Sequence, residues 1–134
     1  MQIDLQLRSD VLKNSSADFS RAVRAFGEGI ILVNRMHLED HPETPKLYES
    51  GVRYQNEKEE LGLDIPSILK KKGSDCLNLC CWRVAELRQA GQKNARLRII
   101  WKENPNGFRL FHVQVRHANG KIEDPSRLLG MGKI

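Results

Sequence analysis

Three cysteines fall within the segment GSDCLNLCC, at Cys76, Cys80 and Cys81. A thiol can act as a nucleophile, a metal ligand, half of a disulfide or a small core residue. The odd number of cysteines argues against a disulfide framework. A zinc site would need Cys76, Cys80 and a histidine such as His112, but there is no Cys-x-x-Cys motif and no second cysteine pair. We therefore expect neither a metal nor a cofactor.

Cys76 is the cysteine whose position favours reactivity. Ser74 or Asp75 can cap a helix that begins here, which places Cys76 in its first turn. The unpaired N–H groups and the positive dipole end of that turn favour a thiolate, and they can also bind an oxyanion. Cys80 and Cys81 lie one turn further along the apolar stripe, so we expect inert core thiols there. Without a base and an orienting carboxylate elsewhere in the chain, Cys76 would also be interpreted as a core residue.

A base and an orienting carboxylate for Cys76 lie downstream in FHVQVRHANGKIEDPS. His112 falls on a predicted strand and Asp124 on the next. A two-residue turn would point Asp124 away from His112. A three-residue loop over residues 118–120, with its glycine in the left-handed conformation, would place Asp124 opposite Gln114, on the same face as His112. A Cys–His–Asp site therefore requires the longer loop.

Other assignments of these residues remain open. His117 is a competing base, and Glu123 would replace Asp124 if the loop had two residues. His112 could instead be a structural histidine, and Asp124 could simply begin a turn before a proline. A further histidine pair, His37 and His41, has one-turn spacing but is better read as a surface pair. The histidines and acids alone therefore do not decide between a site and a structural role.

The first half of the chain predicts mostly helices. Residues 2–8 alternate apolar and polar side chains, as a short strand does. A helix is expected from residues 15–18, where Ser15, Ser16 or Asp18 could cap it, to about Leu38, although Gly27 and Gly29 weaken its middle. Residues 39–50 read as a loop, and residues 64–73 as a short helix with Pro66 in its first turn and Gly73 at its end.

The second half predicts one central helix and then a sheet. The helix runs from about Asp75 to Ala90, stops at Gly91 and is apolar on more than one side. Strands are expected at residues 95–101, 108–115 and 121–124, separated by the turns NPNG and HANG. Helices followed by an antiparallel meander indicate an α+β fold.

Composition narrows the class of protein. The chain has 134 residues, of which 40% are hydrophobic and 29% charged, and its net charge is +5. These values are typical of one soluble globular domain.

Neither a secretory signal nor a membrane-spanning segment is recognisable, so we expect a cytoplasmic protein with reduced thiols and no membrane partner. The basic residues are scattered, with one cluster at 70–72, and no nucleic-acid-binding motif accompanies them. Binding to nucleic acid is therefore not expected.

The order and spacing of these residues resemble a known family. GSDC at the start of a long helix, FHV on a later strand and EDPS on the next are similar to the transglutaminase-like superfamily of papain-type cysteine enzymes, in particular to small bacteriophage-type members. The resemblance covers residues 47–131, with residues 1–46 forming an extra N-terminal strand and helix region of the same domain. It implies that Cys76 is the nucleophile, His112 the general base and acid, and Asp124 the orienting carboxylate.

The sequence also departs from the family pattern. Leu77 and Asn78 follow the cysteine where many relatives carry an acidic pair, which puts the substrate or partner in doubt. Tyr54 and Gln55 are the candidates for the oxyanion side chain that the family usually supplies from upstream. The resemblance implies acyl transfer or hydrolysis at an amide or peptide bond of a protein or peptide. The alternative is a non-catalytic module that binds proteins, for example in phage or virion assembly, which would make the chain virion-associated.

Overall fold

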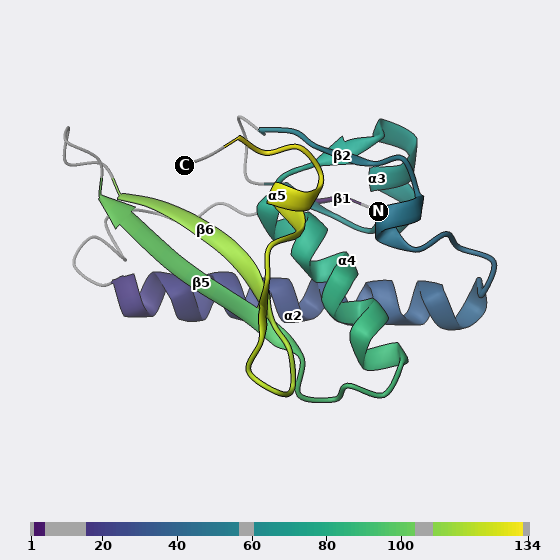
Figure 1. Ribbon diagram of the computed structural model, residues 1–134, viewed down its shortest axis with the longest axis horizontal. Coiled ribbons are helices and arrows are strands. Elements are labelled where there is room, and N and C mark those ends of the chain that lie inside the picture. Colours follow the sequence, from purple (N-terminus) through teal and green to yellow (C-terminus); the bar gives the residue numbers. More distant parts are fainter. Residues whose placement is uncertain (1, 5–15, 57–60, 104–108, 133–134) are drawn as a thin grey trace.

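The computed structural model describes residues 2–4, 16–56, 61–103 and 109–132. It has an α+β fold built around one buried helix, α4 (Cys76–Gln89), which crosses the long helix α2 (Ser16–Asp40) (Figure 1). The remaining helices are short: η1 (Leu47–Glu49), α3 (Ile65–Lys71) and α5 (Pro125–Leu128). Within the described ranges, no helix is long and apolar enough to cross a membrane.

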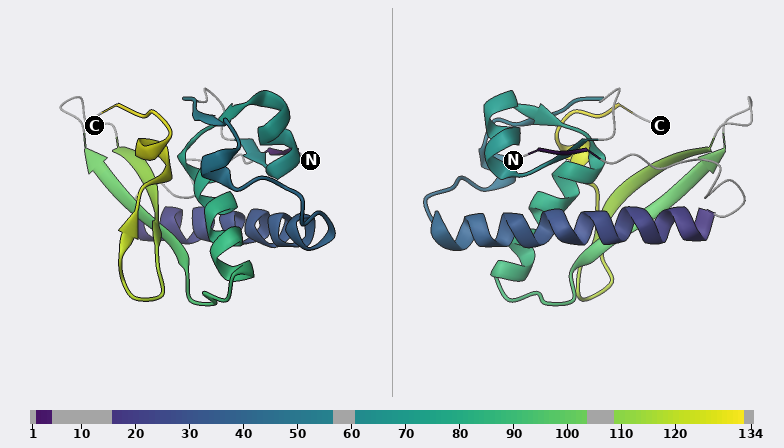
Figure 2. Two further views of the ribbon diagram at one scale, coloured as in Figure 1. Left: turned by 45° about the vertical axis from the view of Figure 1, so that its right-hand side comes forward. Right: turned by 180° about the vertical axis from the view of Figure 1, so that it is seen from behind.

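The strands form three small sheets. The largest is antiparallel, in the order β5 (Arg96–Glu103), β6 (Arg109–Arg116) and β7 (Ile122–Glu123). Strand β1 (Gln2–Asp4) pairs antiparallel with β3 (Leu61–Leu63), and β2 (Arg53–Tyr54) pairs parallel with β4 (Gly73–Ser74). Seen from behind, α2 runs across the molecule, with the β5–β6 hairpin at one end (Figure 2).

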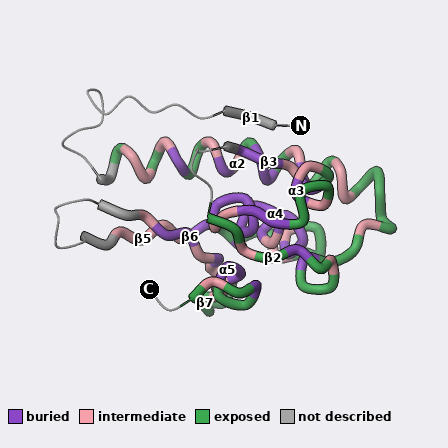
Figure 3. The backbone as a smooth tube through the Cα atoms, turned by 90° about the horizontal axis from the view of Figure 1, so that it is seen from above, coloured by how far each residue is buried: buried purple, intermediate pink, exposed green. Residues whose placement is uncertain are grey.

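Two hydrophobic clusters meet at α4. One side of the helix, including Cys80, Cys81 and Val84, packs with α2, β5 and β6. The other side contributes Leu79 and Trp82 to a second cluster with η1, α3 and the segment after α5. Figure 3 shows α4 buried along most of its length, between α2 and the segments of β2 and α5. The expected central helix, covered on more than one side, is therefore confirmed.

Most of the predicted elements are present, with shifted ends. Helix α2 continues to Asp40, two residues beyond the predicted end, and residues 47–49 of the expected loop form η1. The glycines do not interrupt α2. Gly27 instead allows α2 to approach β5 closely, since a Cβ there would lie 2.5 Å from Leu97 Cδ1 of β5. Residues 5–8 of the predicted first strand, Ser15 and the NPNG turn lie outside the described residues.

Two details of the prediction are wrong. The left-handed residue that ends α3 is Lys72, with φ of 66°, rather than Gly73, which belongs to β4. The sheets are also not restricted to a C-terminal meander, because β2, β3 and β4 precede α4. These strands are only two or three residues long, too short to produce a recognisable alternation of apolar and polar residues.

Candidate active site

The start of α4 is fixed by a cap and by a buried amide. Asp75 is the N-cap, and its carboxylate accepts a hydrogen bond from Asn78 N at 3.1 Å. The Asn78 side chain, fully buried, donates to Ser74 Oγ at 3.0 Å and accepts from Leu63 N at 3.0 Å. Cys76 is therefore the first residue of the helix, in the turn where free N–H groups and the helix dipole favour an anion.

The other two thiols lie deeper. Cys80 and Cys81 are both fully buried, as the sequence predicted for core residues. Cys80 Sγ donates to Val113 O at 3.3 Å, and Cys81 Sγ to Gly27 O at 3.5 Å. Burial raises the pKa of both thiols well above the ordinary value, and nearby acidic groups, including Asp75, raise the pKa further. These two thiols stay neutral and unreactive near neutral pH.

The loop between β6 and β7 has the three-residue form. His117 N donates to Lys121 O at 2.8 Å, and Gly120 takes a φ of 90° between them. The strands pair Val115 with Glu123 and Arg116 with Ile122, a register that places Asp124 opposite Gln114. The predicted condition for bringing Asp124 to the face of His112 is thus met.

His112 and Asp124 are hydrogen-bonded. His112 Nε2 lies 2.8 Å from Asp124 Oδ2, and the histidine is 5% exposed. Gln114 Nε2 donates to the same carboxylate oxygen at 3.2 Å, and Arg98 Nη1 in turn donates to Gln114 Oε1 at 2.5 Å. Burial disfavours the ionised carboxyl, but the bonds from His112 and Gln114 outweigh it and hold the pKa of Asp124 below its ordinary value.

The ionised Asp124 fixes the tautomer of the imidazole. A carboxylate only accepts hydrogen bonds, so Nε2 of His112 must carry the proton that it shares with Asp124. Nδ1 is then the nitrogen able to take a proton from another group. Cys80 contacts the carbonyl of Val113, the residue next to His112, and Cys76 lies one helical turn before Cys80. The strand that carries His112 therefore contacts α4 one helical turn after Cys76.

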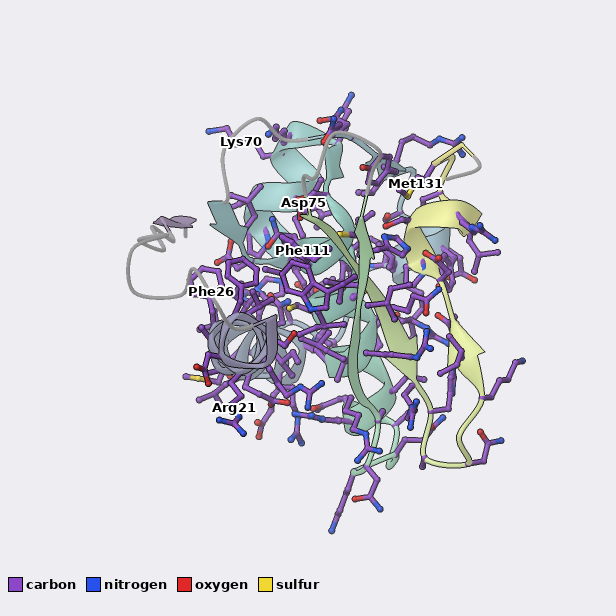
Figure 4. All side chains as sticks on the ribbon, turned by 90° about the vertical axis from the view of Figure 1, so that its left-hand side faces the viewer. Arg21, Phe26, Lys70, Asp75, Phe111 and Met131 are labelled. Atoms are coloured by element: carbon purple, nitrogen blue, oxygen red, sulfur yellow. The ribbon has the colours of Figure 1, made fainter. Side chains whose placement is uncertain are left out.

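Backbone hydrogen bonds bring a third segment to the helix start. Gln55 N donates to Ser74 O at 2.8 Å, and Tyr54 N donates to Leu129 O, just after α5, at 3.0 Å. Strand β2 thus joins the segment before Cys76 to the segment after Asp124. Figure 4 gives the setting of this region: Asp75 labels the start of α4, Phe111 strand β6, and Met131 the segment after α5.

Both predicted oxyanion candidates lie beside this helix start. The Gln55 side chain covers the backbone of Gly73, where a Cβ would lie 2.5 Å from Gln55 Nε2. Burial raises the pKa of Tyr54, and the negative charges of Cys76 and Asp75 raise it further. Tyr54 is therefore close enough to Cys76 to sense its charge. Of these two candidates, Gln55 is the one that carries a side-chain amide N–H.

No known family model, curated protein or solved structure matches the chain.

The competing histidines have other partners. His117 Nε2 lies 2.8 Å from Glu123 Oε1, so the histidine just after β6 pairs with the acid of β7. His37 and His41 stack with their ring centroids 4.6 Å apart, and His41 Nδ1 lies 3.2 Å from Glu43 Oε1 at the surface. The surface pair is confirmed. Among the described residues, no three His, Cys, Asp or Glu side chains are grouped to hold a metal ion.

Several polar residues of the site region were missed from the sequence. Glu86 is 3% exposed within α4 and accepts hydrogen bonds from Leu47 N at 2.8 Å and Trp82 Nε1 at 3.0 Å. Arg83 bonds both Glu86 and Glu123. A charged residue on the apolar stripe of a buried helix is a signal that a partner must exist, since an unpaired buried charge is costly. The sequence does not name that partner.

Proposed function

We propose that the chain is a transglutaminase-like cysteine enzyme of the papain type that uses Cys76, His112 and Asp124 for acyl transfer or hydrolysis at an amide or peptide bond. The observation that carries the proposal is the buried His112–Asp124 hydrogen bond of 2.8 Å, formed beside a helix whose first residue is a cysteine. A thiol nucleophile, a base and a group that orients the base are the three parts such catalysis needs.

Each residue then has a defined step. Nδ1 of His112 takes the proton of the Cys76 thiol, and the positive end of the α4 dipole stabilises the thiolate. The sulfur attacks the carbonyl carbon of the substrate, and the carbonyl oxygen becomes an oxyanion. The N–H groups at the start of α4 and the Gln55 amide donate to that oxyanion. The imidazolium returns its proton to the departing nitrogen as the C–N bond breaks, which leaves a thioester on Cys76.

The second half of the reaction restores the thiol. His112 takes a proton from water or from an acceptor amine, which attacks the thioester carbonyl and releases the acyl group. Water gives hydrolysis, as in a peptidase, amidase or deamidase, and an amine gives transamidation. The substrate is a protein or peptide, and phage structural proteins are among the candidates that the resemblance suggests. No cofactor takes part in these steps.

The pH dependence of Cys76 alkylation tests the nucleophile. With iodoacetamide at pH 6, Cys76 is expected to react about 10- to 100-fold faster than a model thiol, whose pKa is about 8.5. Cys80 and Cys81 act as internal controls and should stay unlabelled until the protein unfolds. His112→Ala should remove the advantage, while His41→Ala, a surface change, should keep it. A Cys76 that reacts like the model thiol and ignores His112→Ala would remove the enzyme proposal and favour a binding module.

Capture of the acyl-enzyme tests the reaction and identifies the substrate. Wild-type protein is mixed with a peptide pool, quenched in acid and examined by intact-mass spectrometry for a thioester. The adduct should form on the wild type and on Cys80→Ala, and not on Cys76→Ala.

Gly73 offers a test of the oxyanion donor that leaves the triad unchanged. A methyl group at Gly73 would meet the Gln55 side chain, so Gly73→Ala should displace the amide from the start of α4. We expect Gly73→Ala and Gln55→Ala each to slow acylation of Cys76 by about 10²-fold, the usual cost of one oxyanion donor. Gly29→Ala is the matched control, because its Cβ would meet nothing within 4 Å in helix α2. Full activity in Gly73→Ala would exclude Gln55 from the site.

A further inference from the structure

Glu123, next to Asp124 in the chain, forms hydrogen bonds with three different parts of the chain. Arg83 of α4 donates from Nε to Oε2 at 2.7 Å and from Nη2 to Oε1 at 3.4 Å. Nε2 of His117, the residue just after β6, lies 2.8 Å from Oε1, and Tyr48 of η1 donates to Oε2. The Glu123 side chain is only 13% exposed. Such charge-assisted bonds in a largely buried place are stronger than ordinary surface pairs.

The group that anchors Glu123 is itself anchored in the core. Arg83 also pairs with Glu86 at 3.3 Å, and the guanidinium carbon lies 5.3 Å above the centre of the Tyr48 ring. Glu86 is held by Leu47 N and Trp82. The side chains of Tyr48, Arg83, Glu86 and His117 thus form one network around Glu123. Strand β7 is tied through this network to α4 and η1.

Strand β7 is short. It consists of Ile122 and Glu123 and pairs with β6 through those two residues. Asp124 follows immediately and caps α5, whose end packs on α4 through Leu129. The bond between Arg83 and Glu123 connects Asp124 to α4 from the other side, at the residue just before it. That bond therefore helps to set where the carboxylate lies relative to the nucleophile.

We propose that Glu123 is a positioning residue, which fixes β7 to α4 through Arg83, Tyr48 and His117 and thereby holds Asp124 against His112. This inference rests on the proposed function in one respect: the effect on Cys76 matters only if Cys76 is the nucleophile. The effect on His112 does not depend on it.

The sign of the effect separates positioning from simple charge. Removal of a nearby negative charge, by itself, makes a thiolate easier to form and lowers the pKa of Cys76. Loss of the Asp124–His112 alignment removes the base and raises that pKa. Glu123→Gln keeps the size of the side chain and removes its charge, so the two explanations predict opposite shifts. Arg83→Met does not separate them, because loss of a cation also raises the pKa of a thiol.

The experiment compares Glu123→Gln with the wild type in two measurements. The first is the pH profile of Cys76 alkylation, in which the variant should react about 10-fold more slowly at pH 6, through an apparent pKa raised by about one unit. The second is the NMR signal of the His112 Nε2 proton, which should exchange faster once Asp124 is no longer held. Tyr48→Phe, which removes one donor at a partly exposed residue, should shift both measurements in the same direction by less.

Arg88→Met is the matched control. Arg88 is also a residue of α4 and donates to Glu28 at 2.7 and 2.8 Å, but it connects α4 to α2 rather than to β7. Arg88→Met should therefore change neither the alkylation profile of Cys76 nor the His112 signal. An unchanged or lowered pKa of Cys76 in Glu123→Gln, with an unchanged His112 signal, would overturn the inference. If wild-type Cys76 reacts like a model thiol, the proposed function fails, and the His112 signal alone then decides the positioning role.

Discussion

Replacement of Asp124 by alanine is expected to slow acylation of Cys76 by about 10³-fold, because His112 loses the partner that fixes its tautomer and orientation. His112 is 5% exposed and its Nε2 bonds Asp124 at 2.8 Å, so the alanine variant leaves a buried ring nitrogen without its acceptor. Asp124→Asn is expected to lose about as much, because the carboxamide lacks the charge that stabilises the imidazolium and can donate to Nε2, which favours the wrong tautomer. The rate of acyl-enzyme formation on the captured substrate gives the measurement.

Asp124 also caps α5, so the alanine variant needs a control for stability. Its Oδ1 accepts from Arg127 N at 3.3 Å, and loss of an N-cap costs about 0.5–2 kcal/mol. Asp64→Ala removes the equivalent cap of α3, where Oδ1 accepts from Ser67 N at 3.2 Å. It should lower the melting temperature in a similar way without a similar loss of rate. Equal loss of rate in both variants would mean that Asp124 is only a cap.

The same carboxylate predicts how stability depends on pH. The pKa of Asp124 is lowered in the folded protein, so its stabilising effect is complete above the unfolded pKa of about 4. The effect is lost as the pH falls below that value and through the lower folded pKa. Between pH 4 and pH 2, Asp124→Asn should therefore lose less stability than the wild type does.

The parts of the site that are continuous in sequence could be predicted. Asp75 before an apolar run defines the start of α4. The sequence allowed a two- or a three-residue loop at 118–120, and the structure has the longer one, in which Gly120 is left-handed and Asp124 reaches the face of His112. Local preferences decide both features: an N-cap satisfies free N–H groups, and a left-handed position favours glycine. The roles of Cys80 and Cys81 followed from the same helical spacing.

The parts that depend on distant contacts could not be predicted. Strands β2 and β4 are two residues each, and their pairing places Gln55 over Gly73 only because the chain folds back there. Glu123 was considered as a substitute for Asp124, and its partners Arg83, Tyr48 and His117 come from three other parts of the chain. Hydrogen-bond partners of this kind are set by the tertiary fold, which single-residue propensities do not encode.

Trp82→Ala is expected to destabilise the fold by about 3–5 kcal/mol, the range for removal of a large buried aromatic side chain. Trp82 is fully buried in the second cluster, which packs α4 against η1, α3 and the segment after α5. Total stabilities of single domains are about 5–15 kcal/mol, so this loss is a large fraction of the whole. Urea unfolding of the variant, followed by circular dichroism, measures it.

Trp82→Phe separates packing from hydrogen bonding at this position. The phenylalanine keeps most of the apolar contact but cannot donate to Glu86 Oε2, which Trp82 Nε1 reaches at 3.0 Å. Glu86 would still accept from Leu47 N and pair with Arg83, so we expect a cost of about 1–2 kcal/mol. Because the same cluster supports η1, and Tyr48 of η1 bonds Glu123, Trp82→Ala should also weaken the tie between β7 and α4. A cost below about 1 kcal/mol for Trp82→Ala would show that the second cluster is not part of the cooperative core.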